Sequence, residues 1–146
     1  MSAKKNKALV ERFVEEFWNE GNLSAADELM TPEAVIHMPT GELVDLDGLK
    51  SFAGTLRESF PDWHSTLEEM IAEGDKVAER WTGRGTHRGE LMGIPPTGKR
   101  VEVPGSVFYG IVDGKIVEFR GLFNMMSLMQ QLGVMPSPQH AKRSHP

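Results

Sequence analysis

The chain contains no cysteine. Disulfide bonds, thiolate catalysis and zinc sites built on cysteine are therefore excluded. The five histidines are scattered along the sequence, and no close His/Asp/Glu cluster offers the three or four converging ligands of a metal site. We therefore expect no bound metal, and the absence of cysteine fits the cytoplasmic location that we expect.

The chain also lacks long runs of positive charge and long apolar runs. Its formal net charge is −5, whereas a nucleic-acid partner requires a basic face. No apolar run approaches the ~20 residues that span a bilayer. The first residues, MSAKKNKALVERF, are basic and then amphipathic, without the continuous apolar core of a secretory signal. We expect neither a nucleic-acid nor a membrane partner.

What remains is an ordinary globular composition. The 146 residues are 39% hydrophobic and 25% charged, enough for one sizeable core. Residues 1–134 carry periodic apolar patterns without an internal linker, and we expect a single domain there. Residues 135–146 have no apolar period, which predicts a disordered tail.

Two periodicities divide the chain. Apolar residues at three- and four-residue steps predict helices near 7–19, 24–30 and 47–59, and Asp45 or Asp47 can cap the third of these. The stretch AVIHMP, residues 34–39, predicts a short strand. Alternating residues then predict four strands and a closing helix, at 63–72, 76–87, 100–112, 115–123 and 125–132.

This order of elements predicts an α+β fold. Long antiparallel strands that follow one another as a meander must curl to bury the apolar stripes of the N-terminal helices. We expect a cone-shaped curled antiparallel sheet with these helices packed in its concave face. An apolar cavity in the open mouth of such a cone is expected as well.

A series of short motifs resembles the SnoaL-like polyketide (ester) cyclases. FPD, EGDKVA-RW, GTHRGE, GIPPTGK, DGKIVE and LMQQLG occur in that family's order and spacing, over about residues 5–134. The resemblance implies the α+β barrel of the nuclear transport factor two and ketosteroid isomerase superfamily. This architecture agrees with the cone predicted from the periodicity.

The resemblance also implies an activity. Well-understood members close a ring by intramolecular aldol condensation, with one pocket aspartate as acid/base and without metal or cofactor. The ligand implied is a small, mostly apolar or aromatic carbonyl compound, polyketide-like, and the chemistry is proton transfer followed by ring closure. Related cones commonly pair through their outer sheet face, so we expect a homodimer.

The chain departs from the family at the end of its last strand. In the window EFRGLFN, Gly121 and Asn124 stand at positions where similar relatives carry aspartate. An amide cannot take up a proton near neutral pH. Two alternatives therefore stay open beside the cyclase: a non-catalytic cone that binds a small molecule or dimerises, and a cone-fold hydrolase.

Polar residues near this junction are the first candidates for chemistry. Glu118, Arg120 and Asn124 share one face of the predicted strand 115–123. If that face lines the cavity, Arg120 and Asn124 are oxyanion donors, and Glu118 or His37 is the base. The alternative is an Arg120–Glu118 surface pair or a dimer contact.

Aromatic residues on the helices and strands are candidates for the walls of a ligand site. Trp81 is the first of these, because Gly83 and Gly85 follow on its face and leave room beside it. The full set of expected substrate-binding residues is Trp18, Phe52, Trp63, Trp81, His87, Phe108, Gly121 and Leu122.

Overall fold

The computed structural model describes residues 2–136. Apart from Met135 and Pro136, the tail that we expected to be disordered lies outside the described residues. The helical segments are α1 (Ala3–Phe13), the π-helical η1 (Val14–Asn19), α2 (Ala25–Leu29), α3 (Leu46–Ser59) and α4 (Met125–Leu132). The strands are β1 (Met30–His37), β2 (Leu43–Val44), β3 (His64–Glu73), β4 (Lys76–Thr86), β5 (Arg100–Val112) and β6 (Lys115–Phe123).

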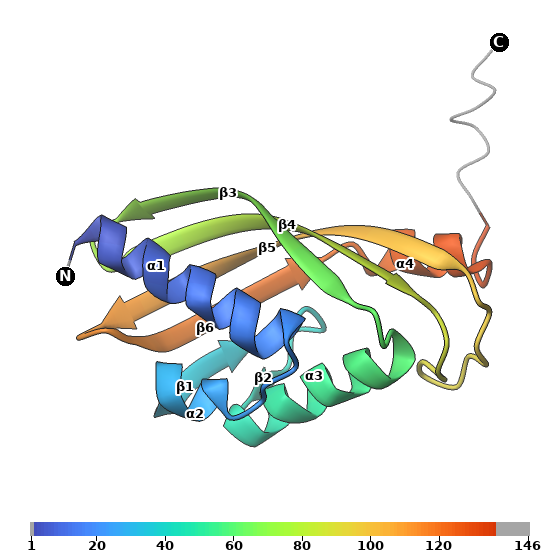
Figure 1. Ribbon diagram of the computed structural model, residues 1–146, viewed down its shortest axis with the longest axis horizontal. Helices are drawn as coiled ribbons and strands as arrows, with labels where there is room; N and C mark the ends of the chain where they lie inside the picture. The colour runs from blue at the N-terminus through green and yellow to red at the C-terminus, as the bar shows by residue number, and fades with distance from the viewer. Residues whose placement is uncertain (1, 137–146) are drawn as a thin grey trace, which may run out of the picture.

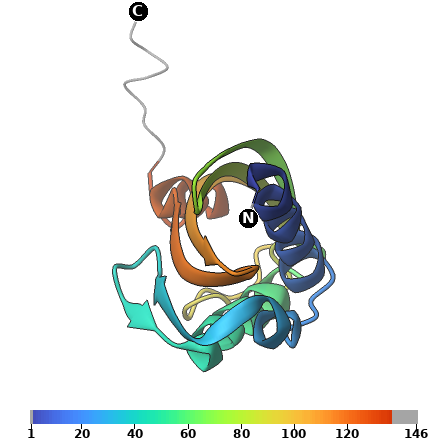
Figure 2. The same cartoon turned by 90° about the vertical axis from the view of Figure 1, so that its left-hand side faces the viewer.

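The α+β class and the curled sheet are confirmed. Six strands form one sheet in the order β2-β1-β6-β5-β4-β3, which wraps around an interior without closing (Figure 2). The pair β1–β6 is parallel and the other pairs are antiparallel. The expectation of a wholly antiparallel sheet is therefore wrong at this pair, where the two strands are far apart in the chain and no hairpin sets their direction.

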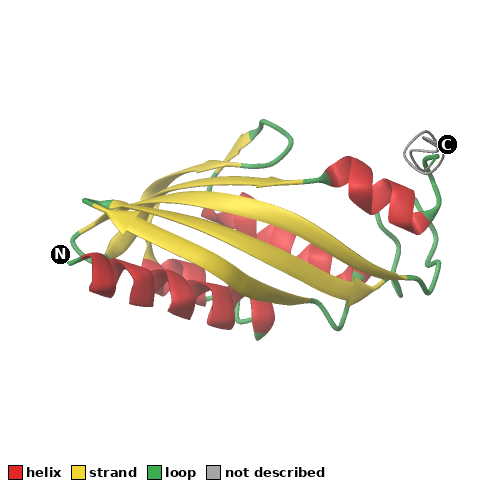
Figure 3. Ribbon diagram, turned by 90° about the horizontal axis from the view of Figure 1, so that it is seen from above, coloured by secondary structure: helices red, strands yellow, loops and turns green. Residues whose placement is uncertain are grey.

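Helices cover the concave side of the sheet. α1 contacts β3 and β4, α3 contacts β1, and α4 contacts β5. α1 runs along the sheet, and α4 lies at the end of the molecule away from the N-terminus (Figures 1 and 3). The space between the sheet and α3 is therefore available to side chains from both layers.

The first helix fills the interior with aromatic rings. Phe13 stacks on Phe17 with a centroid separation of 4.9 Å, and it meets Tyr109 and Phe119 edge-on at 6.3 Å each. All four rings are buried. The helix begins at Ala3, earlier than predicted, and widens to π geometry after Phe13. Such π segments often occur at functional sites.

No helix among residues 2–136 has the length and hydropathy needed to cross a membrane.

The N-terminus of α3 identifies which of two aspartates is its cap. The Asp45 carboxylate accepts a hydrogen bond from the backbone N–H of Gly48 at 2.9 Å, while Asp47 lies in the first turn. We expect Asp45→Ala to lower the unfolding free energy by about 1 kcal/mol. Urea unfolding measures this value, and Asp47→Ala is the matched control. A larger loss in Asp47→Ala would contradict the assignment.

Candidate active site

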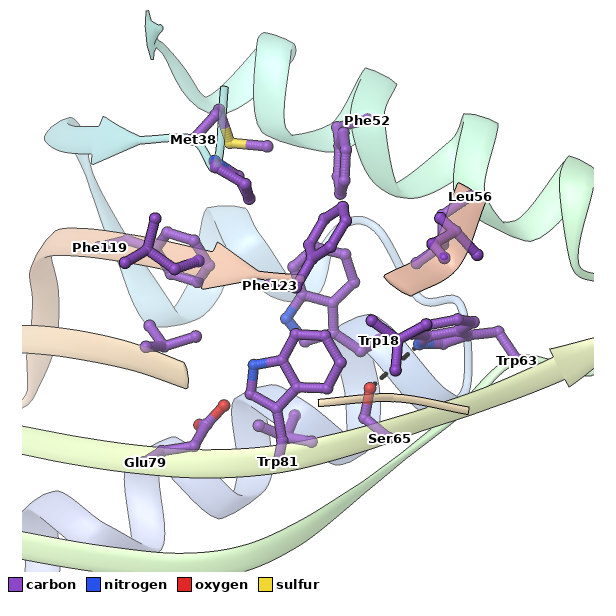
Figure 4. Close-up of a pocket in the computed structure, with 16 residues that line it drawn as sticks. Trp18, Met38, Phe52, Leu56, Trp63, Ser65, Glu79, Trp81, Phe119 and Phe123 are labelled. Atoms are coloured by element: carbon purple, nitrogen blue, oxygen red, sulfur yellow. Dashed lines mark hydrogen bonds between the residues drawn. The ribbon is translucent and has the colours of Figure 1, made fainter. Parts of the chain in front are cut away.

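A cavity opens between the concave face of the sheet and the helices η1 and α3 (Figure 4). Including the part that is open to solvent, it measures about 680 Å³. Its lining is almost wholly apolar, and consists of Val14, Trp18, Met38, Pro39, Phe52, Leu56, Trp63, Ser65, Glu79, Trp81, Val103, Val107, Phe119, Leu122, Phe123 and Leu128.

Aromatic rings in edge contact form much of this lining. Trp18 meets Phe52 at a centroid distance of 6.2 Å, Trp63 meets Trp81 at 6.3 Å, and Trp81 meets Phe123 at 6.4 Å. These rings come from η1, α3, the turn before β3, β4 and β6, so ring faces and edges surround the space from several sides. Such a surface suits a planar, largely apolar ligand.

Glycines on the sheet let the tryptophans lie against it. A Cβ atom built on Gly83 would come within 2.1 Å of Trp63, and one built on Gly105 would come within 2.1 Å of Trp81. A Cβ on Gly85 would approach Phe60 and Trp63. The room that we assigned to a ligand beside Trp81 is therefore filled by the protein's own rings.

The polar side chains in the lining are Ser65 and Glu79. The Ser65 hydroxyl oxygen accepts a hydrogen bond from the Trp63 indole N–H at 3.0 Å. Glu79, only 5% exposed, accepts one from the Tyr109 hydroxyl at 2.8 Å. Glu79 is thus the one ionisable group among the lining residues.

Burial changes the acidity of both partners in this pair. Desolvation raises the pKa of Glu79 from its ordinary 4.5 to about 7, although the hydrogen bond from Tyr109 acts in the lowering direction. Burial, together with the neighbouring Glu79, raises the pKa of Tyr109 well above its ordinary value. The phenol therefore stays protonated while Glu79 titrates near neutral pH.

Glu118 and Arg120 on β6 point away from the cavity. The roles considered for these side chains required that they line it. Arg120 is exposed, and its Nε donates to Glu118 Oε2 at 2.7 Å. The Nζ atom of Lys76 lies 3.2 Å from Oε1 of Glu118. The hydrogen bond from Arg120, then that from Lys76, lower the pKa of Glu118. This is the surface pair that we gave as the alternative.

Asn124 and His37 also lie outside the cavity lining. Asn124 is exposed and caps α4, where its side-chain oxygen accepts from the backbone N–H of Ser127 at 2.9 Å. His37 is half-buried and pairs with Leu43 and Arg120 in neighbouring strands. Its neighbours Ile36 and Met38 are buried, so alternation turns His37 outward.

Five of the eight expected substrate-binding residues line the cavity. Trp18, Phe52, Trp63, Trp81 and Leu122 line the cavity, Leu122 at its open side with 63% of its surface exposed.

The remaining three do not line the cavity. Phe108 is 58% exposed on the outer face of the sheet. His87 is fully buried beside Phe60, and its Nδ1 accepts from the backbone N–H of Thr97, so it fixes the loop that follows β4. Gly121 is buried, and a Cβ there would come within 2.9 Å of the Phe119 ring.

Glu79 was not among the expected site residues, although the sequence contained a signal for it. It occupies the unspecified position, written as a dash, in the motif EGDKVA-RW. Strand alternation places it on the face of Val77 and Trp81, opposite Arg80 and Arg84. A carboxylate between two apolar residues of one strand face predicts a buried ionisable group.

No group of three or more His, Asp or Glu side chains that could hold a metal ion occurs within the described part of the chain. The chemistry that the lining itself offers is that of one carboxyl group in an apolar, aromatic cavity. Such a group can accept and return a proton.

We expect the buried Glu79 to make stability depend on pH. Because its folded pKa lies above its ordinary value, the folded state holds the proton more tightly than the unfolded state. The unfolding free energy therefore falls as the pH rises from about 4.5 to about 7, by about 3 kcal/mol in total. Urea unfolding across this range measures the change.

In Glu79→Gln the unfolding free energy should not show this fall with rising pH. Glu69→Gln, a change at an exposed position of β3, should show it as the wild type does. Identical pH dependence in wild type and Glu79→Gln would contradict the assignment.

Comparison with known proteins agrees with this architecture. The family model described as SnoaL-like polyketide cyclase matches residues 8–132. Nogalonic acid methyl ester cyclase of Streptomyces nogalater is 32% identical over 80% of this chain and 89% of its own length. Aklanonic acid methyl ester cyclase DnrD of Streptomyces peucetius is 32% identical over 90% of this chain and 93% of its own.

Solved structures give the same result. AclR from Streptomyces galilaeus, a candidate hydroxylase, superposes with a TM-score of 0.87 at 32% identity, covering 99% of this chain and 95% of its own. TsrD from Streptomyces laurentii superposes with a TM-score of 0.81 at 27% identity, covering 92% of this chain and 99% of its own. The chain belongs to the SnoaL-like polyketide cyclase family.

Proposed function

We propose that the protein closes a ring in a mostly apolar, polyketide-like carbonyl compound by cofactor-free proton transfer. The observation that carries the proposal is the aromatic cavity with one carboxyl group in its lining. An intramolecular aldol addition moves protons and forms one carbon–carbon bond, with no net oxidation. The protein must therefore supply a proton acceptor, hydrogen-bond donors and a surface that holds the substrate in a folded conformation.

The lining favours substrates that are largely apolar and contain flat rings. Aklanonic acid methyl ester and nogalonic acid methyl ester are the compounds for which two relatives are named. Transfer of apolar ring surface from water to such a lining contributes about 25 cal/mol for each Å² buried. The edges of Trp18, Phe52 and Trp81 supply contacts for flat rings.

The main competitor is a cone that binds without catalysis. It is favoured by Gly121 and Asn124, which stand where similar relatives carry aspartate. Asn124 is a helix cap and Gly121 has no side chain to offer. A cone-fold hydrolase is the second competitor, and it would need an acid and a cation facing one water, whereas the charged side chain of the lining is Glu79 alone.

We expect purified protein to convert aklanonic acid methyl ester into a product of unchanged mass, since aldol addition is an isomerisation. Liquid chromatography with mass spectrometry separates the outcomes: a product lighter by one CH2 group, the free acid left when methanol is released, indicates hydrolysis of the ester, and gain of one oxygen indicates hydroxylation. Binding without any new product would support the non-catalytic cone. Leu56→Trp, which adds bulk to the lining, should lower turnover, and Asp47→Ala serves as the matched surface control.

We also propose that two copies of the chain pair through the outer face of the sheet. Val35 and Phe108 are large apolar side chains that are exposed there, and exposed apolar side chains on one face mark interaction surfaces. Light scattering should give twice the chain mass of 16.3 kDa. Phe108→Glu should give the single-chain mass, while Val112→Glu, at the far end of β5, is the control. A single-chain mass for the wild type at high concentration would exclude pairing.

A further inference from the structure

Glu79 occupies an unusual position for a charged residue. It extends from the middle of β4 into an otherwise apolar lining, between Val77 and Trp81 on the same strand face. In the sheet it is paired with Val107, which is paired in turn with Gly121. The carboxyl group therefore lies over the central strands and well inside the mouth of the cavity.

One of its two oxygens is held by the protein and the other is available. The Tyr109 hydroxyl donates to Oε1 at 2.8 Å. Among residues 2–136 no donor reaches Oε2, and that oxygen is not fully enclosed by protein atoms. Figure 4 shows the carboxyl group pointing from β4 into the space in front of Phe119 and Trp81. The hydrogen bond from Tyr109 accounts for Oε1, whereas Oε2 faces the cavity.

Trp81 offers a donor beside this oxygen. Its indole N–H donates to no residue in the described part of the chain, unlike that of Trp63, which donates to Ser65. The nitrogen edge of the Trp81 ring is turned to the side of Glu79 (Figure 4). Residues two apart on one strand face lie about 7 Å apart along the strand. That spacing suits a carbon acid and its neighbouring carbonyl oxygen.

We propose, resting on the function proposed above, that Glu79 is the catalytic base of this cavity and that the Trp81 N–H holds the enolate oxygen. Oε2 takes the proton from a carbon between two carbonyls, and the electrons of that C–H bond pass into the enolate. The enolate carbon attacks a ketone carbon of the same molecule, forming a C–C bond and an alkoxide. The alkoxide takes the proton back from Glu79, so the carboxylate is regenerated and the product is an isomer.

The surroundings of Glu79 suit this cycle near neutral pH. Tyr109 on β5 is the titratable group that contacts it, and the lining residues contributed by η1, α3, β3, β5, β6 and α4 carry no charge. Burial raises its pKa to about 7, where an acid/base group has both forms available. Tyr109 is a positioning residue, because its hydrogen bond favours the ionised form of Glu79.

The test measures deuterium exchange at the acidic carbon of methyl naphthoylacetate, followed by proton NMR in heavy water. Wild type should accelerate exchange over buffer, with a rate that rises with pH and levels off above about 7. Glu79→Gln should lower the enzymatic rate by about 100-fold or more. Quenching of tryptophan fluorescence by the same ester should give a similar Kd in both, which separates chemistry from binding and folding.

Three further variants sharpen the result. Glu79→Asp keeps a carboxyl group and should retain part of the rate. Tyr109→Phe should move the midpoint of the pH–rate profile upward, an effect that loss of packing alone would not produce. Trp81→Phe should lower the rate and leave the midpoint in place, and Glu69→Gln should match the wild type.

The outcomes also separate this inference from the proposed function. If wild type cyclises aklanonic acid methyl ester and Glu79→Gln does so equally well, the inference is overturned and the cyclase stands. Loss of exchange in Glu118→Gln or His37→Ala, with exchange kept in Glu79→Gln, would place the base elsewhere and overturn it too. If wild type neither exchanges nor cyclises, both proposals fail.

Discussion

The site depends on a packing constraint: tryptophan rings lie on the sheet only where the strands carry no Cβ. Gly83 and Gly105 provide that room for Trp63 and Trp81, since a methyl group at either position would come within 2.1 Å of a ring. Protein interiors tolerate little overpacking, because added atoms force rings and backbone to shift. The glycines thus place the rings, and the rings place the walls of the cavity. A substitution at either glycine would therefore displace a ring of the cavity wall.

Burial of Glu79 opposes stability and favours chemistry. A carboxylate taken out of water is costly unless it is hydrogen-bonded or protonated, and here one hydrogen bond from Tyr109 only partly offsets the cost. A glutamine or an apolar residue would fill the same place with less penalty at high pH. Retaining an acid there has a physical reason if the group exchanges protons with a ligand, since the same desolvation that destabilises the fold brings the pKa of the group to the working range.

The sequence predicted the elements better than it predicted the site. Apolar spacing located α3 and the four long strands closely, because each of these segments buries one face and the period is therefore strong. The direction of β1 and the π-helical turn at Val14–Asn19 depend on contacts between distant segments, which no local pattern contains. The sequence left open which face of β6 lines the cavity, because alternation separates the two faces without saying which of them points inward. The mouth of a curled sheet is lined by its apolar face, so Phe119 and Phe123 point in, and Glu118 and Arg120 point out.

The two faces of β6 differ in their chemistry. The outer face carries the Glu118–Arg120 pair and the contact of Glu118 with Lys76. The inner face carries Phe119 and Phe123, together with Gly121, whose missing side chain is replaced in space by the Phe119 ring. A side chain at Gly121 would therefore collide with the Phe119 ring. Glu79 lies on the same row of the sheet, because it pairs with Val107, which pairs with Gly121. On this row the carboxyl group comes from β4, whereas β6 contributes no side chain.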